Sequence, residues 1–162
     1  MSWFLNGCLP FPRPVCACLT FARLADVVIL AFVLSGCQTQ LAPSYDQTIV
    51  DNLTTADKDT LTLYANVSHG TTRDTAQKRL PDYNSVIGAF DAIHIDIDAR
   101  ANPKPDTPVP TVGSVKKIIE TLTNLRDTDI ATGLKPGFVA VSKADYELAI
   151  VPALFYEKAL KR

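Results

Sequence analysis

Three side chains have types and spacing that could bind a ligand or a metal ion: Asp91, His94 and Asp98. On a helix they occupy positions i, i+3 and i+7 and lie near one side. A carboxylate-x-x-His pair that faces a bundle interior is half of a di-iron site, which needs a second pair and two more inward carboxylates. The only other histidine is His69, and no helix supplies the missing pair. We therefore favour a structural, neutral His94 at the core, with a small-ligand or single-metal site as the alternative.

Nucleophilic catalysis is the other chemistry to consider, at Ser68 and His69. A serine enzyme needs its nucleophile on a sharp turn, an oxyanion hole and a buried carboxylate behind the histidine. The sequence has no G-x-S-x-G elbow, and Gly70 indicates that these residues end a helix. Arg126 is expected to form an ion pair with Asp129 or with an acidic residue of a neighbouring helix. We expect no catalytic residue, no cofactor and no enzymatic activity.

The most specific signal in the sequence lies around Cys37. Residues 27–34 form an uncharged apolar run of the length of a signal-peptide core. The run is shorter than the roughly 20 apolar residues that span a bilayer, and extending it backwards meets Asp26 and Arg23. Leu34-Ser35-Gly36-Cys37 follows it directly. This tetrapeptide and its apolar lead-in resemble the lipobox of bacterial lipoproteins.

The resemblance implies that residues 1–36 are a signal peptide, removed just before Cys37. It also implies that the Cys37 sulfur carries a diacylglycerol and that the new amino group is acylated. Two or three acyl chains, at about 0.8 kcal/mol per buried methylene, would make the attachment to the bilayer effectively permanent. Gln38 stands where an aspartate would favour the inner membrane, so the outer membrane is favoured. The alternative is an uncleaved single-pass anchor that ends in an incidental cysteine.

Charge and cysteine content narrow the possible classes of protein. The formal net charge of the chain is −1, and few of its charges lie in residues 1–36. A near-neutral chain lacks the basic stripe that is typical of nucleic-acid-binding proteins, so no nucleic-acid partner is expected. Three of the four cysteines also precede Cys37, so the mature chain could form no internal disulfide.

Apolar residues recur every three or four positions along residues 44–162, which predicts a helical domain after a short tether at 37–43. The expected helices cover about 45–67, 81–101, 112–131 and 143–161. A connector at 102–110 contains four prolines and cannot be helical. The predicted fold is therefore all-α, a four-helix up-down-up-down bundle.

Local motifs predict where these helices begin and end. Ser44-Tyr45-Asp46-Gln47 and Ser142-Lys143-Ala144-Asp145 have the pattern of capping boxes, in which side chains bond to free backbone amides. Residues 71–78 are expected to form a loop or a frayed helix start, and residues 138–141 a short extended segment. Gly133 is expected to end the third helix.

The last predicted helix is apolar on more than one side. The face that we expect to line the core consists of Leu148, Val151, Pro152, Phe155 and Ala159. The candidate partner surface lies off this face and consists of Tyr146, Ile150 and Leu154. Two interpretations stay open for the second set. It is buried under the connector and residues 138–141, or it is an exposed strip that meets an envelope protein, a second copy or the membrane surface.

Together these features predict a lipoprotein of the bacterial envelope that faces the periplasm and is anchored through acylated Cys37. Its expected role is that of a non-enzymatic adaptor or structural protein, which contacts an envelope protein or associates with itself through the last helix. The domain is similar in style to small helical-bundle lipoproteins of Gram-negative bacteria. The alternative is a small-ligand or metal-binding lipoprotein that uses the helix face of Asp91, His94 and Asp98.

Overall fold

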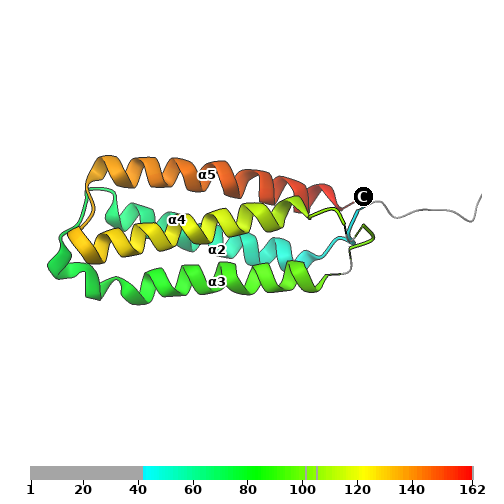
Figure 1. Cartoon of the computed structure of the whole chain (residues 1–162), viewed down its shortest axis with the longest axis horizontal. Coiled ribbons are helices and arrows are strands. Elements are labelled where there is room, and N and C mark those ends of the chain that lie inside the picture. The colour runs from blue at the N-terminus through cyan, green and yellow to red at the C-terminus, as the bar shows by residue number, and fades with distance from the viewer. Residues whose placement is uncertain (1–41, 101, 105, 162) are drawn as a thin grey trace, which may run out of the picture. The chain divides into compact units, whose positions relative to one another are not determined.

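The computed structural model describes residues 42–100, 102–104 and 106–161. Every regular element in these residues is a helix, as predicted (Figure 1). The predicted signal peptide at 1–36, the lipidation site Cys37 and the tether as far as residue 41 lie outside the described residues. No helix in the described ranges combines the length and the apolar character that crossing a bilayer requires.

The described chain forms four α-helices and one 3-10 helix. In chain order they are α2 (Gln47–Val67), the 3-10 helix η1 (Arg73–Lys78), α3 (Leu80–Ala99), α4 (Pro110–Thr132) and α5 (Pro136–Ala159). The ends of α2, α3 and α4 lie within two residues of the predicted ones. The periodicity of apolar residues therefore located these three helices correctly.

The N-terminal cap of α2 differs from the predicted capping box. Asp46 has an extended backbone and its carboxylate accepts the N–H of Thr48 at 2.8 Å, so Asp46 rather than Ser44 is the cap. Gln47 donates instead to the Asp51 carboxylate, at 2.7 Å. Aspartate caps a helix as well as serine does, and it places the start of the helix two residues later.

The start of α5 is the largest difference from the prediction. The helix begins at Pro136, so residues 138–141 are helical rather than extended and Ser142 is not a cap. Ser142 is buried within the helix, where its hydroxyl lies 2.9 Å from the Tyr64 hydroxyl. Proline suits the first turn because its φ is already helical and its missing N–H would have no partner there.

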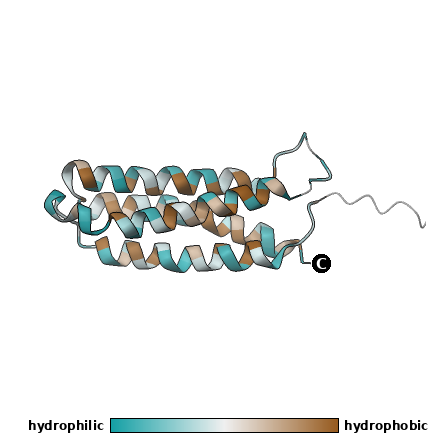
Figure 2. Ribbon diagram, turned by 90° about the horizontal axis from the view of Figure 1, so that it is seen from below, coloured by the Kyte–Doolittle hydropathy of each residue, from teal (hydrophilic) through white to brown (hydrophobic). Residues whose placement is uncertain are grey.

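The four α-helices pack side by side around one apolar core (Figure 1). α2 contacts α3 and α5, and α4 contacts the same two helices. In the described ranges the backbones of the diagonal pairs, α2 with α4 and α3 with α5, do not approach each other closely, although the Phe90 ring of α3 meets the Tyr146 ring of α5 in the core. Each helix alternates hydrophobic and hydrophilic residues along its length (Figure 2). Each also contributes fully buried side chains to the core, such as Leu53, Phe90, Leu122 and Tyr146.

The turns that follow α2 and α4 touch each other at one end of the bundle. The N–H of Thr71 donates to the Leu134 carbonyl, and the Leu134 N–H donates to the Thr71 hydroxyl, both at 2.9 Å. Gly70 and Gly133 have φ values of 85° and 77°. A Cβ on either glycine would lie within 2.7 Å of a carbonyl oxygen in the opposite turn. Glycine therefore permits both the backbone conformation and the close approach.

Candidate functional site

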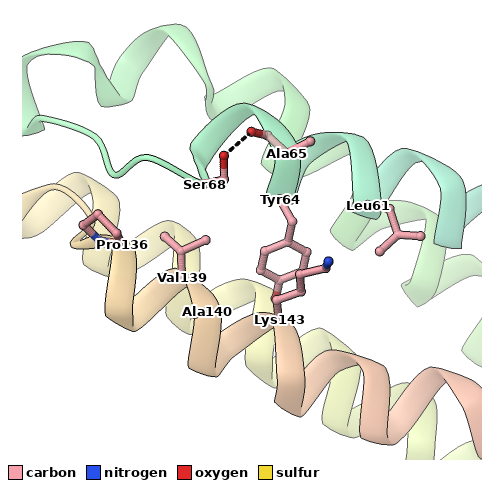
Figure 3. A pocket seen from close by; sticks show the side chains of 8 residues that line it. All are labelled: Leu61, Tyr64, Ala65, Ser68, Pro136, Val139, Ala140 and Lys143. Carbon is pink, nitrogen blue, oxygen red and sulfur yellow. Dashed lines mark hydrogen bonds between the residues drawn. The ribbon is translucent and has the colours of Figure 1, made fainter.

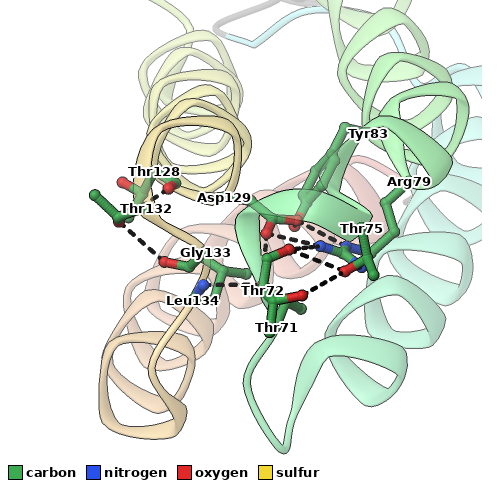
Figure 4. Close-up of polar contacts among 10 residues, drawn as sticks. All are labelled: Thr71, Thr72, Thr75, Arg79, Tyr83, Thr128, Asp129, Thr132, Gly133 and Leu134. Carbon is green, nitrogen blue, oxygen red and sulfur yellow. Dashed lines mark hydrogen bonds and ion pairs between the residues drawn. The ribbon is translucent and has the colours of Figure 1, made fainter.

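A fully buried carboxylate, Asp129, forms the centre of a polar cluster next to these turns (Figure 4). Arg79 donates to both of its oxygens, from Nε to Oδ2 at 2.7 Å and from Nη2 to Oδ1 at 2.8 Å. The Tyr83 hydroxyl donates to Oδ2 at 3.1 Å, and the Thr71 hydroxyl donates to Oδ1. The cluster joins α4 to the start of α3 and to the turn after α2.

The predicted pairing of Arg126 with Asp129 is wrong. Arg126 instead lies 3.0 Å from the exposed carboxylate of Asp127 and 3.4 Å from Asn84. Sequence reasoning placed Asp129 on the correct helix but missed Arg79, because Arg79 precedes α3 and belongs to no periodic pattern. Burial raises the pKa of Asp129, but hydrogen bonds from Arg79 and Thr71 outweigh it, and the pKa lies below its usual value.

A second buried carboxylate, Glu157, lies near the C-terminal end of α5. The Arg100 guanidinium donates to both of its oxygens, at 2.7 and 3.0 Å, and the Thr111 hydroxyl donates to Oε1 at 2.7 Å. Arg100 also donates to the backbone carbonyl of Ser44, at 3.4 Å. This cluster joins the end of α3, the start of α4, the end of α5 and the segment before α2.

Both clusters join helix ends through hydrogen bonds to a buried carboxylate. Each carboxylate oxygen of Asp129 and Glu157 accepts at least one hydrogen bond from the protein itself. A general base needs an oxygen that can reach a substrate proton. Neither Asp129 nor Glu157 lines the surface groove between α2 and α5.

The structure does not assemble a metal site from Asp91, His94 and Asp98. His94 is partly buried and lies 3.5 Å from the Asp98 carboxylate, while Asp91 and Asp98 are exposed on α3. The described residues contain no group of three or more His, Cys, Asp or Glu side chains arranged to hold a metal ion. His94 thus lies at the edge of the core, beside the exposed carboxylate of Asp98.

A shallow groove of about 370 Å³ lies between α2 and α5 (Figure 3). Its walls are mostly apolar and include Leu61 and Val139. Its polar side chains are already engaged: Tyr64 with Ser142, Ser68 with the Ala65 carbonyl at 2.8 Å, and Lys143 with Glu147 at 3.4 Å. The groove therefore offers few free polar groups with which to select a ligand.

Three tyrosine side chains are buried in the core, and their ionisation is suppressed. Burial raises the pKa of Tyr64 to about 12. Burial also raises the pKa of Tyr83 and of Tyr146, and the neighbouring Asp129 and Asp57 carboxylates raise each of them further. Tyr146 donates to Asp57 at 2.7 Å, and its ring packs against those of Tyr64 and Phe90. The native state thus binds these phenolic protons more tightly than the unfolded chain does.

These tyrosines predict a steep loss of stability in alkali. Their stabilising contribution is complete below the unfolded pKa of about 10 and is lost as the pH rises through the folded values. We expect the free energy of unfolding to fall above about pH 10, by up to about 1.4 kcal/mol per pH unit for each tyrosine. Urea unfolding at several pH values measures the slope, and Tyr64→Phe should reduce it. Phenolate absorbance from Tyr64, Tyr83 or Tyr146 in the folded protein near pH 10 would contradict this prediction.

The structure reverses the predicted faces of α5. The candidate partner surface is not exposed: Tyr146 and Ile150 are in the core and Leu154 is partly buried. Leu148 and Phe155, which were expected to line the core, are each 76% exposed. Because the helix is apolar on both sides, periodicity alone could not show which side is buried.

The outward face of α5 is defined here by six exposed, uncharged residues: Val141, Ala144, Leu148, Val151, Pro152 and Phe155. At 100° per residue, they share a stripe about 100° wide. Single exposed apolar residues are normal, but a continuous apolar stripe marks an interaction surface. This face is therefore the candidate functional site.

No protein-family model, curated protein or solved structure matches the chain.

Proposed function

We propose that this chain is a lipid-anchored protein of the bacterial envelope that acts as a non-enzymatic adaptor or structural component. The lipobox-like residues Leu34-Ser35-Gly36-Cys37 support attachment through acylated Cys37. Gln38 after the cysteine supports a position facing the periplasm, at the outer membrane rather than the inner membrane. The domain that follows is proposed to be a four-helix up-down-up-down bundle, joined to the anchor by a tether of about 20 Å.

The outward face of α5 is the observation that carries the proposed role. A helix in a bundle needs one apolar side, yet α5 has a second one that nothing in the described residues covers. The buried charges of Asp129 and Glu157 are used to join helix ends. The molecule therefore offers a docking face on a rigid scaffold, which suits adhesion or assembly better than chemistry.

Lipidation at Cys37 is the first testable consequence. Intact-mass analysis of protein from native membranes is expected to find a chain that begins at Cys37 and carries two or three acyl groups. The variant Cys37→Ala removes the thiol that is alkylated, so it should keep residues 1–36 and carry no acyl group. A wild-type product that retains residues 1–36 without an acyl group would overturn the proposed anchor.

A further inference from the structure

We propose that the outward face of α5 lies on the surface of the lipid bilayer, so that the bundle rests on its side against the membrane. The inference depends on the proposed anchor and names the partner of the docking face. An apolar helix stripe next to basic residues is the pattern of helices that lie in the membrane interface. The face runs about 21 Å along α5, from Val141 to Phe155 at about 1.5 Å per residue.

The position of the segment before α2 supports this orientation. Arg100 joins the Ser44 carbonyl to Glu157 of α5, and the Lys161 ammonium lies 5.6 Å from the centre of the Tyr45 ring. The chain thus reaches the bundle beside the C-terminal end of α5 (Figure 1). A tether of about 20 Å from Cys37 then keeps α5 within reach of the lipid surface.

The charges at this end of α5 suit a lipid surface that contains anionic headgroups. Lys158 is exposed and lies beside the apolar stripe, one turn from Phe155, and Lys161 follows it. Glu157, the acidic residue next to Lys158, is buried on the core side of α5 and paired with Arg100. The stripe is thus flanked by positive charge at the end where the anchored tether arrives.

Pro152 indicates how deep the face should lie. Proline has no N–H, so the carbonyl of Leu148 receives no hydrogen bond from it. A carbonyl without a partner is costly in hydrocarbon but is satisfied by water among the headgroups. The stripe should therefore lie at the level of the headgroups, with Leu148 and Phe155 reaching the first part of the acyl chains.

A second copy of the chain fits this face less well than lipid does. If two stripes packed in parallel, Lys158 would lie near its counterpart, and like charges repel. If they packed antiparallel, the two tethers would reach the dimer at opposite ends, about 36 Å apart. A lipid surface accepts the stripe without either cost.

Tryptophan fluorescence can test this orientation on the lipidated chain. The sequence has one tryptophan, Trp3, which lies in the segment expected to be removed. The variants Phe155→Trp and Ile95→Trp each add a reporter at an exposed apolar position, on α5 and on the diagonal helix α3. Each is reconstituted into vesicles of phosphatidylethanolamine and phosphatidylglycerol, with and without brominated acyl chains. Brominated lipid should quench Phe155→Trp about twofold or more and leave Ile95→Trp nearly unchanged.

Each result decides the proposal. Equal quenching of Phe155→Trp and Ile95→Trp, or none of either in vesicle-bound and acylated protein, overturns the orientation while the anchor stands. A blue-shifted Phe155→Trp that is not quenched, together with a crosslinked dimer, assigns the face to a second copy instead. A chain that carries no acyl group and does not sediment with the vesicles overturns the anchor and the orientation together.

Discussion

Replacing Asp129 with asparagine is expected to lower the free energy of unfolding by about 3 kcal/mol. The carboxylate is fully buried and accepts hydrogen bonds from Arg79, Tyr83 and Thr71. An amide keeps the shape but loses the charge, and its NH₂ group points a donor at other donors. Because Arg79 keeps some contact with water, the loss should lie at the lower end of the range for broken buried ion pairs.

Asp127→Asn is the matched control, because it makes the same change two residues earlier on α4. Asp127 is exposed and its partner Arg126 lies 3.0 Å away. An exposed pair of this kind contributes about 0–1 kcal/mol. Urea unfolding of the two variants at neutral pH measures the difference. Equal midpoints for Asp127→Asn and Asp129→Asn would show that the buried cluster does not stabilise the fold.

Asp129→Asn should also change how the free energy of unfolding depends on pH in acid. The pKa of Asp129 lies below its usual value because the hydrogen bonds outweigh the effect of burial. A carboxyl of this kind stabilises the native state above its unfolded pKa of about 3.9, and the contribution is lost as the pH falls through the folded value. Asp129→Asn should therefore lose less stability than the wild type between neutral pH and about pH 3.

The sequence pattern was sufficient for three of the four long helices and insufficient for α5. Leu53, Phe90 and Leu122 lie in stripes with one apolar side, so their burial follows from periodicity. In α5, Ile150 and Val151 are consecutive apolar residues whose side chains point about 100° apart, one into the core and one outward. Only the packing of α2 and α4 against α5 decides that Ile150 is inside. The same ambiguity placed the candidate partner surface on the wrong side.

The capping motif at Ser142 was misleading for a related reason. A Ser-x-x-Asp pattern marks a helix start only where the preceding residues cannot be helical. Pro136 and Gly133 are the stronger signals, because they fix the local backbone, and together they place the turn at residues 133–135. Ser142 therefore does not cap the helix, and its hydroxyl bonds to the Tyr64 hydroxyl in the core.

The burial of Asp129 and Glu157 could have been predicted from the periodicity of the apolar residues. Asp129 follows Leu122 and Leu125 at helical spacing, and Glu157 likewise follows Ile150 and Ala153. An acidic residue in the register of a buried stripe requires a partner, because an unpaired buried charge is very costly. Its partner could not be found from sequence, since Arg79 and Arg100 lie outside the helix interiors, at the cap positions of α3.

The second large effect is expected at Glu157, where Glu157→Gln should lower the free energy of unfolding by about 4 kcal/mol. The substitution leaves the Arg100 guanidinium, whose side chain is 6% exposed, without a counter-charge. Glu147→Gln is the matched control on the same helix, since Glu147 is exposed and lies 3.4 Å from Lys143. It should change the free energy of unfolding by less than about 1 kcal/mol.

The double variant Arg100→Met/Glu157→Met separates the cost of an orphaned charge from the contribution of the pair. Two apolar side chains of similar volume need no counter-charge, and replacements of this kind are often neutral or stabilising. The double variant should therefore recover most of the stability that Glu157→Gln loses, as measured by urea unfolding. If it is as unstable as the single variant, the ion pair itself holds the ends of α3 and α5 together. In that case the segment before α2, bound through Ser44, should loosen as well, and amide hydrogen exchange at Tyr45 and Asp46 would report it.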